Sequence, residues 1–458
     1  MSGAAKAQGF PHLRMSFLPQ PTSGQPVELV LAKVNGDDPI SGKPFLQQIY
    51  DQLTQPLTAE EMYAGMMPEQ VPPRLVEPDT AENLEAYFHA QGWTDGLPIV
   101  LPTEERVAAM IAGCNRSPHE YVGKMQTNPV YPPLTYDVER VAVNAVMAGC
   151  KPEHFPVILA LAASCDTALF SSTNSWTRMM VVNGPMALEL GMNGSLGALG
   201  PWNQANAVLG RAWTIMSKNL GYAVPGVTYM GSQGNNFDYN HICIAENEEM
   251  LPAGWDPFHV MKGFEKDESV VSIFAGVSMR QTNVDGWQPL GFHKGSAARY
   301  VQMAEMSSQP GPVIQLACTL LIDPLVAANL ARDFATRQDF MMHMFNNAYY
   351  SAGEFFRSYP SYRAKAQEGV EPYKTWLASP SDTRVPVLKY RLDTEYGPPE
   401  ASYRNPALNV VVVGGGTNAF TWMTNFGHRE SVGIDQFRPE TPWAPIVGPD
   451  AYPYIPGY

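Results

Sequence analysis

Apolar residues recur at helical spacing after Thr135, and this is the clearest local pattern in the chain. The periodic positions are Val138, Val141, Ala142, Ala145 and Val146. Thr135 can cap the start of the predicted helix, and the acidic residues Asp137 and Glu139 suit the positive end of its dipole. We expect this helix to end at Gly149 and a second helix to open at Pro152, because proline is favoured in the first turn.

Helical and strand-like patterns alternate through most of the chain after residue 80. Besides the pair above, helices are predicted at residues 81–93, 103–114, 203–220 and 297–307, and more than one helix at 324–356. Strands are predicted at residues 97–102, 179–182, 239–245, 269–277, 312–320 and 410–413. Because these strands are almost continuously apolar, they favour an α/β fold with a mostly parallel or mixed buried sheet flanked by helices.

Proline-rich segments at both ends differ from this regular pattern. Residues 1–78 are predicted to form an N-terminal arm with one short docking helix near residues 45–53, and residues 438–458 a C-terminal arm rich in proline and tyrosine. Between them we expect an α/β domain at 79–265 and a second α/β lobe at 266–437. Arms of this kind can wrap a neighbouring subunit, so a homo- or hetero-oligomer is predicted.

Composition indicates the class of protein and of partner. The 458 residues are 45% hydrophobic and 16% charged, which is typical of a globular protein. A formal net charge of −14, without a run of Lys and Arg, argues against nucleic acid as a ligand. No signal-peptide pattern or membrane-length apolar segment is found, which predicts no membrane association and a cytoplasmic location. The five cysteines are widely spaced and contain no C-x-x-C pair, so reduced thiols are expected rather than disulfides or a zinc site.

Cys150 lies at the predicted hinge between the two helices of the first pattern. Amide groups and the positive dipole end of the helix at Pro152 would lower the pKa of its thiol, so Cys150 is a candidate nucleophile or redox residue. The alternative interpretation is a small buried residue in a tight connection, since free cysteines are among the most buried residue types.

A glycine-rich stretch precedes the predicted helix at 203–220. Gly194, Gly197 and Gly200 form a predicted anion-binding loop, because small residues let backbone amides approach a carboxylate or phosphate. Asn203 is the expected helix cap, and Arg211 would join the site only if the chain folds back. The alternative is close helix packing around glycines, since the stretch lacks the Gly-Lys-Ser/Thr of a P-loop.

The segment YNHICIAENEE, residues 239–249, carries the candidate acid/base residues. Strand alternation places His241 and Cys243 on one face and Glu246 on the other. We expect Glu246 and Glu248 to form a pair in which burial raises the pKa of the inner carboxyl, Glu246, and suits it to general acid catalysis. The alternative is a solvated acidic loop. Without clustered histidines or H-E-x-x-H no metal is predicted, and His241, Cys243 and Glu246 are the first ligands to test if one is bound.

A second glycine turn follows the predicted strand at 410–413. Gly414, Gly416 and Ala419 satisfy G-x-G-x-x-A, and Asp435 follows at the spacing of a ribose-binding acid. One interpretation is a nicotinamide dinucleotide site. The other is a strand, turn and helix that close the sheet, because too little chain remains to complete a nucleotide domain.

Five segments together resemble a known family. They are TDGLPIVLPTEERV, VAVNAVMAGCKPEHFPVILA, VVNGP, LGALGPWNQANAVLGRA and CIAENEE. The resemblance is to an uncharacterised bacterial family found with, or fused to, proteins that carry a UGSC motif (selenocysteine or cysteine, Gly, Ser, Cys), and it covers residues 81–435. The family-type positions are Asp95, Gly96, Asn144, Cys150, Asn183, Gly184, Gly200, Asn203, Asn206, Arg211, Cys243, Glu246, Asn247 and Glu248. The UGSC tetrad itself is absent, which implies that redox chemistry belongs to a UGSC-type protein partner.

These features predict an enzyme that acts on a small anionic organic molecule. Cys150 would be the nucleophile or redox thiol, and Glu246 with Glu248 the acid/base pair. The residues expected to bind the substrate are Asp95, Asn144, Asn183, Asn203, Asn206 and Arg211. Two alternatives stay open: a non-catalytic subunit that binds substrate or scaffolds a UGSC-type partner, and a nicotinamide-dependent oxidoreductase. The sequence identifies neither a cofactor nor the substrate.

Overall fold

The chain divides into two compact units. The computed structural model describes residues 12–20, 22, 25–62, 74–127, 134–283, 318–347, 349–358, 360–386, 390–391, 394–395, 408–417 and 419–440. One unit comprises the described residues up to Pro78, and the other comprises the described residues from Asp79 onward.

Within its described residues, the first unit contains two short helices, α2 (Val27–Val34) and α3 (Phe45–Thr54). Between them, the carboxylate of Asp38 accepts hydrogen bonds from the backbone N–H groups of Phe17 (2.6 Å) and Ile40 (2.7 Å). Neither helix has a buried side chain. The α3 helix confirms the helix predicted near residues 45–53, whereas α2 lies in a stretch for which no helix is predicted.

The second unit is built around two four-stranded sheets. The first sheet has the order β14 (Gly427–Gly433), β5 (Val270–Gly276), β3 (Thr177–Asn183) and β4 (Ile242–Ala245). The β3 and β4 strands are parallel, and the other pairs are antiparallel. Every residue of β3, β4 and β5 is buried, as the near-continuous apolar runs predict.

Helices pack on one face of this first sheet. The helices of this region are α4 (Ala81–Ala90), α5 (Glu104–Ile111), α6 (Val138–Met147), α7 (Phe155–Ser164), α8 (Pro185–Glu189) and α9 (Gln204–Asn219). Side chains of α5, α6, α7 and α9 share a core with Met180, Cys243 and Ile273 of the sheet. An antiparallel pair, β1 (Tyr121–Met125) and β2 (Leu134–Asp137), and the 3₁₀ turn η1 (Pro152–His154) lie beside them.

The ends of α6 follow from its sequence. Asp137 caps its start by accepting a backbone N–H of the first turn at 3.0 Å, whereas the predicted cap, Thr135, lies in β2. The helix ends before Gly149, as predicted, and this glycine adopts a φ of +87°. The next α-helix begins at Phe155 after η1 rather than at Pro152.

The second sheet has the order β12 (Leu408–Val412), β7 (Cys318–Ile322), β13 (Phe420–Thr424) and β6 (Met279–Asn283). The β12 and β7 strands are parallel, and the other pairs are antiparallel. Its helices are α11 (Pro324–Leu330), α12 (Arg337–Asn347), α13 (Ala352–Ser358), α14 (Pro360–Gln367) and α15 (Tyr373–Ala378). Short strand pairs accompany them, β8 (Tyr349–Ser351) with β9 (Arg384–Pro386) and β10 (Tyr390–Arg391) with β11 (Thr394–Glu395).

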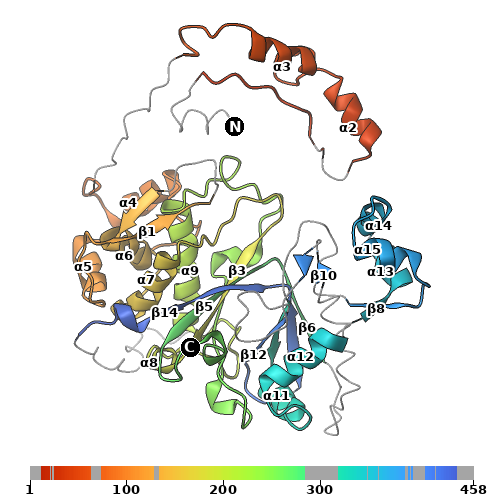
Figure 1. Cartoon of the computed structure of the whole chain (residues 1–458). Helices are drawn as coiled ribbons and strands as arrows, with labels where there is room; N and C mark the ends of the chain where they lie inside the picture. Colours follow the sequence, from red (N-terminus) through yellow and green to blue (C-terminus); the bar gives the residue numbers. More distant parts are fainter. Residues whose placement is uncertain are drawn as a thin grey trace, which may run out of the picture. The chain divides into compact units, whose positions relative to one another are not determined.

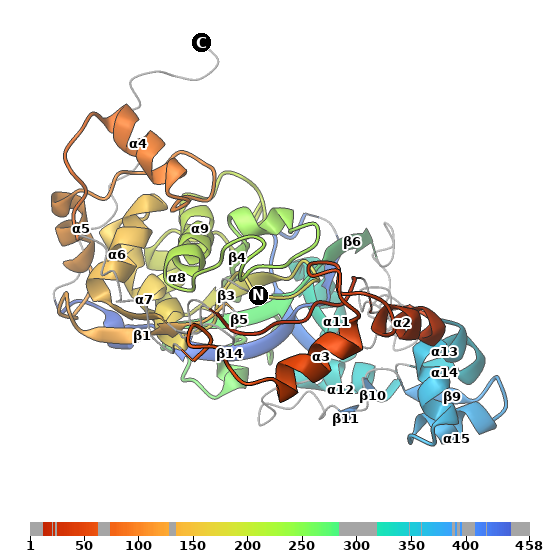
Figure 2. The same ribbon diagram turned by 90° about the horizontal axis from the view of Figure 1, so that it is seen from above.

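The two sheets of the second unit pack against each other. Met179, Ile244 and Phe274 of the first sheet share a core with Leu321 and Val411 of the second. The opposite face of the second sheet packs on α11 to α15. The layers are therefore helix, sheet, sheet and helix, and the strands separate α5, α6, α7 and α9 from α11 and α12 in Figures 1 and 2. Among the described residues, no helix has the length and apolar character that a membrane span needs.

The two sheets repeat one pattern of strand directions. Each has two antiparallel pairs followed by one parallel pair, read from β14 in the first sheet and from β6 in the second. The chain passes from β5 to β6 through Val277 and Ser278, and from β13 to β14 through Asn425 and Phe426. The edge strand β6 of the second sheet therefore follows a strand of the first sheet, and the edge strand β14 of the first sheet follows a strand of the second. Asn425 joins the two crossings, because its Oδ1 accepts the N–H groups of Val277 (2.9 Å) and Ser278 (3.0 Å).

The predicted α/β class with mixed buried sheets is confirmed, and one predicted strand is wrong. Residues 97–102 form no strand, and the carbonyls of Leu97 and Pro98 instead accept hydrogen bonds from Arg211. Pro98 and Pro102 lack the N–H group that a ladder requires, which explains the error. The predicted helix at 297–307, the segment 312–317 and the C-terminal arm after residue 440 lie outside the described residues.

Candidate functional site

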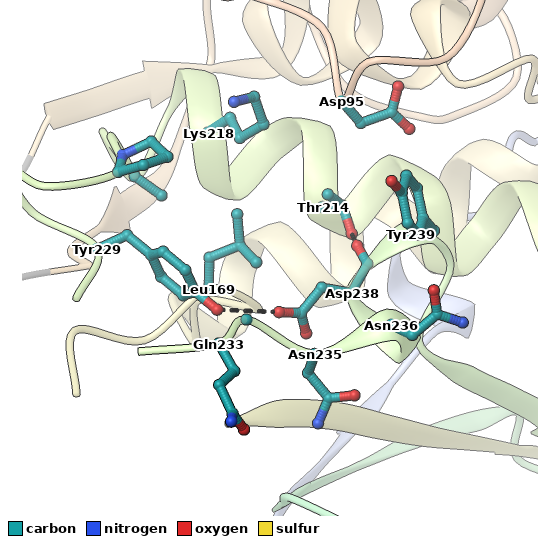
Figure 3. Close-up of a pocket in the computed structure, with 13 residues that line it drawn as sticks. Asp95, Leu169, Thr214, Lys218, Tyr229, Gln233, Asn235, Asn236, Asp238 and Tyr239 are labelled. Atoms are coloured by element: carbon teal, nitrogen blue, oxygen red, sulfur yellow. Dashed lines mark hydrogen bonds between the residues drawn. The ribbon is translucent and has the colours of Figure 1, made fainter. Parts of the chain in front are cut away.

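A cavity of about 520 Å³ lies between α9 and the loop that precedes β4. Thr214 and Lys218 of α9 line it, together with Asp238 from the 3₁₀ turn η2 (Asn236–Tyr239). The other lining residues are Asp95, Leu169, Ala223, Pro225, Tyr229, Gln233, Gly234, Asn235, Asn236 and Tyr239. Figure 3 shows the carboxylate of Asp238 directed at the hydroxyl of Tyr229, near the centre of this set. We call this cavity the Asp238 pocket.

Burial changes the acidity of Asp238. The hydroxyl of Tyr229 donates a hydrogen bond to Oδ2 at 3.2 Å. The other oxygen, Oδ1, is shielded from solvent and has no hydrogen-bond partner among the described residues. Burial raises the pKa of Asp238 to about 6. A carboxyl group with a pKa near neutrality can both accept and release a proton under ordinary conditions.

The imidazole of His241, next to Asp238, is neutral. The Thr214 hydroxyl donates to the backbone carbonyl of Asp238 (2.6 Å), so Nε2 of His241, 2.9 Å away, must donate to the Thr214 oxygen. Nδ1 then accepts from the hydroxyl of Thr177 at 3.1 Å. Burial lowers the pKa of His241 to about 3. The ring therefore stays uncharged at neutral pH and gives no positive charge to Asp238 Oδ1, which lies 3.9 Å from Nδ1.

Lys218 gives the pocket a cationic group. Burial lowers its pKa, and the nearby carboxylate of Asp95 opposes this change. That carboxylate is bound by Arg211 through two hydrogen bonds, Nε to Oδ2 at 2.7 Å and Nη2 to Oδ1 at 2.9 Å. Asp95 and Arg211, both predicted to bind substrate, thus bind each other. Because Arg211 already neutralises Asp95, the ammonium group of Lys218 can bind an anionic ligand.

The loop that carries Asp238 is fixed by its own polar side chains. Asn235 Oδ1 accepts the N–H of Phe237 at 3.1 Å, which begins η2. Its Nδ2 donates to the carbonyls of Ser175 (3.0 Å) and Val277 (2.9 Å). These bonds connect the loop to the segments that flank β3 and β5, so the position of Asp238 is set by the first sheet.

Glu246 lies in a separate buried network at the C-terminal end of β4. Its Oε1 accepts hydrogen bonds from Arg337 Nη1 (2.7 Å) and the N–H of Val412 (3.2 Å). Its Oε2 accepts from Asn183 Nδ2 (2.8 Å) and the N–H of Phe258 (2.6 Å). Arg337 is only 1% exposed, so the ion pair is shielded from water. All four partners are donors, and Glu246 joins β4 to β12 and α12 as an acceptor.

Glu248 belongs to the same network and begins the 3₁₀ turn η3 (Glu248–Met250). Its Oε1 accepts hydrogen bonds from Asn183 Nδ2 and from the N–H of Gly184, each at 2.8 Å. Asn183 therefore bridges Glu246 and Glu248. As expected, Glu246 is the inner residue of the two and Glu248 the more exposed, but neither lines the Asp238 pocket.

The glycine-rich loop is held by two asparagines that were predicted to bind substrate. Asn203 Nδ2 donates to the carbonyls of Gly197 (2.9 Å) and Gly200 (3.2 Å), and its side chain makes no capping bond to α9. Asn206 exchanges two hydrogen bonds with the backbone of Asn193, at 2.9 and 3.0 Å. In the structure both side chains are occupied in fixing the loop.

Cys150 lacks the environment predicted for a nucleophile. Burial raises the pKa of its thiol, with the buried Cys243 adding to the change, and Sγ donates to a carbonyl of α9 at 3.4 Å. The predicted direction is wrong because it considered the helix start near Pro152 and not the desolvation of the thiol, which is the larger effect. Asn144 also lies within the helices, where its amide donates to a carbonyl of its own helix at 2.7 Å.

The three residues named as possible metal ligands each contact different partners. His241 bonds Thr214, Cys243 packs in the core beside α9, and Glu246 bonds Arg337. Within the part of the chain that the structure describes, no group of three or more His, Cys, Asp or Glu side chains is arranged to hold a metal ion.

The structure contradicts the dinucleotide interpretation of the second glycine turn. Gly414 and Gly416 adopt positive φ after β12, but the next element is β13 and not a helix, so no helix start is present to bind a pyrophosphate. Ala419 directly precedes that strand. The carboxylate of Asp435 accepts the N–H of Ser269 at 2.6 Å, at the start of η5 (Asp435–Phe437).

Sequence reasoning did not single out Asp238, Tyr229 or Lys218. The available signal is the stretch YMGSQGNNFDYNH, which combines aromatic, amide and glycine residues in a loop before a buried strand. Comparisons with models of protein families, with curated proteins and with solved structures find no match to this chain. The chemistry of the Asp238 pocket is therefore the basis for a functional assignment.

Proposed function

We propose that this chain is an enzyme that transfers a proton to or from a small organic acid, with Asp238 as the general acid/base. One observation carries the proposal, namely a buried carboxyl group with a pKa raised to about 6 on the wall of a cavity of about 520 Å³. Strongly changed pKa values in a cavity are typical of catalytic groups.

The substrate class follows from the charges around the cavity. Lys218 is the cation available for an anionic group, since Arg211 is engaged by Asp95. A carboxylate on the substrate is the simplest match. Burial also raises the pKa of Tyr229, so its hydroxyl keeps its proton and serves as a donor, either to Asp238 or to a substrate oxygen.

The proposed step is a proton transfer at the carbon next to a carboxylate or carbonyl. Ionised Asp238 takes the proton, and the negative charge that develops on the substrate oxygens is stabilised by Lys218 and the hydroxyl of Tyr229. Protonated Asp238 then returns the proton to the same carbon or to another atom of the substrate. Cys150 and Glu246 have no part in this reaction, because neither lines the pocket.

Hydrogen–deuterium exchange tests the step without knowledge of the product. The protein is incubated in D₂O at about pH 7 with a panel of small carboxylic and keto acids, and loss of substrate C–H signal is followed by proton NMR. Wild type is expected to exchange at least one acid, and Asp238→Asn to lower the rate about 10²- to 10⁴-fold. The matched control is Asp267→Asn, which changes an exposed aspartate outside the pocket. Unchanged exchange in Asp238→Asn, or no exchange of any acid, would refute the proposal.

A second candidate function is a binding subunit for a UGSC-type protein partner, which is what the family resemblance implies. Large apolar side chains at the glycine-rich loop support it, because Trp202 is 81% exposed and Leu196 66% exposed. Replacement of Trp202 by Ser would then abolish co-purification with the partner while proton exchange stays unchanged. Retained co-purification would count against this candidate.

A further inference from the structure

A second cavity, of about 230 Å³, lies between the glycine-rich loop and the turn after β12. We call it the glycine pocket, and its lining residues are 195–200, Gln281, Leu321, Asp323, 413–415, Thr417, Phe420 and Trp422. It shares no lining residue with the Asp238 pocket, so it is a separate candidate site.

Glycines allow the two walls of this pocket to approach closely. The N–H of Gly414 donates to the carbonyl of Gly194 at 2.9 Å. A Cβ atom at Gly414 would lie 2.8 Å from Oδ2 of Asp323, and one at Gly415 would lie 2.7 Å from Cβ of Leu196. Side chains at either position would therefore displace the wall or the acid.

Asparagine side chains hold both walls in place. Asn247 Nδ2 donates to the carbonyl of Gly414 at 2.8 Å, and its backbone N–H donates to Val412 at 2.8 Å. On the other wall, Asn203 bonds the carbonyls of Gly197 and Gly200. The pocket is thus formed before any ligand binds, which limits the entropic cost of binding.

Asp323 supplies the charge of the glycine pocket. It is buried, and its carboxylate accepts the N–H groups of Leu325 (2.9 Å) and Gly416 (3.2 Å). Burial raises its pKa. No Lys, Arg or His occurs among the described residues that line the pocket. An anion at the loop of Gly194, Gly197 and Gly200 would therefore face a carboxylate without a compensating cation, which argues against the predicted anion site.

The complementary ligand is a cation with an apolar body. Phe420 and Trp422 of β13 and Leu321 of β7 line the pocket beside Asp323. Aromatic faces attract ammonium groups as well as apolar groups. We propose that the glycine pocket binds a small organic amine, with its ammonium group against Asp323 and its apolar part against Phe420 and Trp422.

Calorimetric titration with three matched probes tests this site. They are 2-phenylethylamine, the neutral 2-phenylethanol and the anionic phenylacetate. The amine is expected to bind at least about tenfold more tightly than the other two, because only it can form an ion pair with the carboxylate of Asp323. In Asp323→Asn the preference should disappear, while the cap of α11 is kept because Asn caps as well as Asp.

Two further variants keep the test decisive if Asp323→Asn fails to fold. Leu196→Trp enlarges an exposed side chain of the pocket and should block amine binding without lowering the melting temperature. Asp238→Asn should bind the amine as wild type does, because it lies outside the pocket. Equal binding of amine and alcohol, tighter binding of phenylacetate, no binding of any probe, or full amine binding by Leu196→Trp would each overturn the proposal.

Discussion

The two sheets of the second unit share one order of strand directions but differ where their parallel strands end. At the ends of β3 and β4, Asn183 and Glu246 enter a closed network with Arg337. At the ends of β7 and β12, Asp323 and Gly414 border a cavity. The same backbone plan thus supports either a filled ionic network or an open pocket.

The difference lies in side-chain size at corresponding turns. Glu246 follows β4 and forms a buried ion pair with Arg337 from α12. A run of three glycines, residues 414–416, follows β12, and the first two of them line the glycine pocket. Binding sites commonly lie at the carboxyl ends of neighbouring parallel strands. In the first sheet this region is filled by a structural ion pair, and in the second it borders a cavity.

The first prediction concerns a substitution that disrupts the network of Glu246 and Arg337. Arg337→Met removes the cation and leaves Glu246 buried without its charged partner, so a loss of about 3–5 kcal/mol in the free energy of unfolding is expected. Urea denaturation measures it. The double variant Arg337→Met, Glu246→Gln removes the charge that was left unpaired and should recover much of the loss. A single variant as stable as wild type would show that the ion pair does not stabilise this edge.

The second prediction concerns the backbone of the same edge. Gly184 follows β3 at φ +83°, and an added Cβ would lie 2.2 Å from the carbonyl oxygen of Glu268. Gly184→Ala is expected to cost about 2–3 kcal/mol, because a backbone atom cannot move aside easily. Gly191 is the matched control, since it has φ +62° and open space around its Cα. Equal losses in Gly184→Ala and Gly191→Ala would assign the cost to φ alone.

The strands of the first sheet could largely be predicted from sequence, but the way in which the strands are divided between the two sheets could not. The strands β3, β4 and β5 are buried throughout, so their apolar runs were sufficient. The expected lobe boundary at residue 265 precedes β5, which nevertheless lies inside the first sheet. No local pattern shows that the chain changes sheets at Val277 and Ser278, because that exchange depends on contacts with Asn425.

The candidate site shows the same limit of sequence reasoning. Asn203 and Asn206 are polar residues in a glycine-rich stretch, and sequence alone does not show that their amides bond the loop itself. Asp238 is one acid among many in the sequence. Its pKa is raised because α9 and the loop before β4 bury it, and that burial is a tertiary property.

The third prediction extends the comparison to the other end of β4, where Asp238 precedes the strand. Its folded-state pKa of about 6 lies above the ordinary 3.8, so the folded protein holds this proton more tightly than the unfolded chain does. This contribution to stability is present below about pH 4 and is lost as pH rises through about 6. Asp238→Asn, which cannot ionise, should therefore gain about 2 kcal/mol relative to wild type between about pH 4 and pH 8. Urea denaturation at both pH values measures the gain, with Asp267→Asn as the control. A pH-independent difference would contradict the raised pKa.

The last prediction tests the open edge and has the smallest expected effect. An added Cβ at Gly415 would lie 2.7 Å from Cβ and 2.9 Å from Cα of Leu196, a residue that is largely exposed. Gly415→Ala should cost about 1 kcal/mol, the lower end of the range for overpacking, because the exposed segment around Leu196 can shift by a small amount. Measured against Leu196→Gly alone, the double variant Gly415→Ala, Leu196→Gly should recover part of this loss in urea denaturation, since glycine removes the Cβ and Cδ1 atoms that the added methyl would meet. A loss in Gly415→Ala as large as that in Gly184→Ala, or no recovery in the double variant, would show that the turn after β12 is as rigidly packed as the edge at β3. The contrast between a filled and an open edge would then no longer hold.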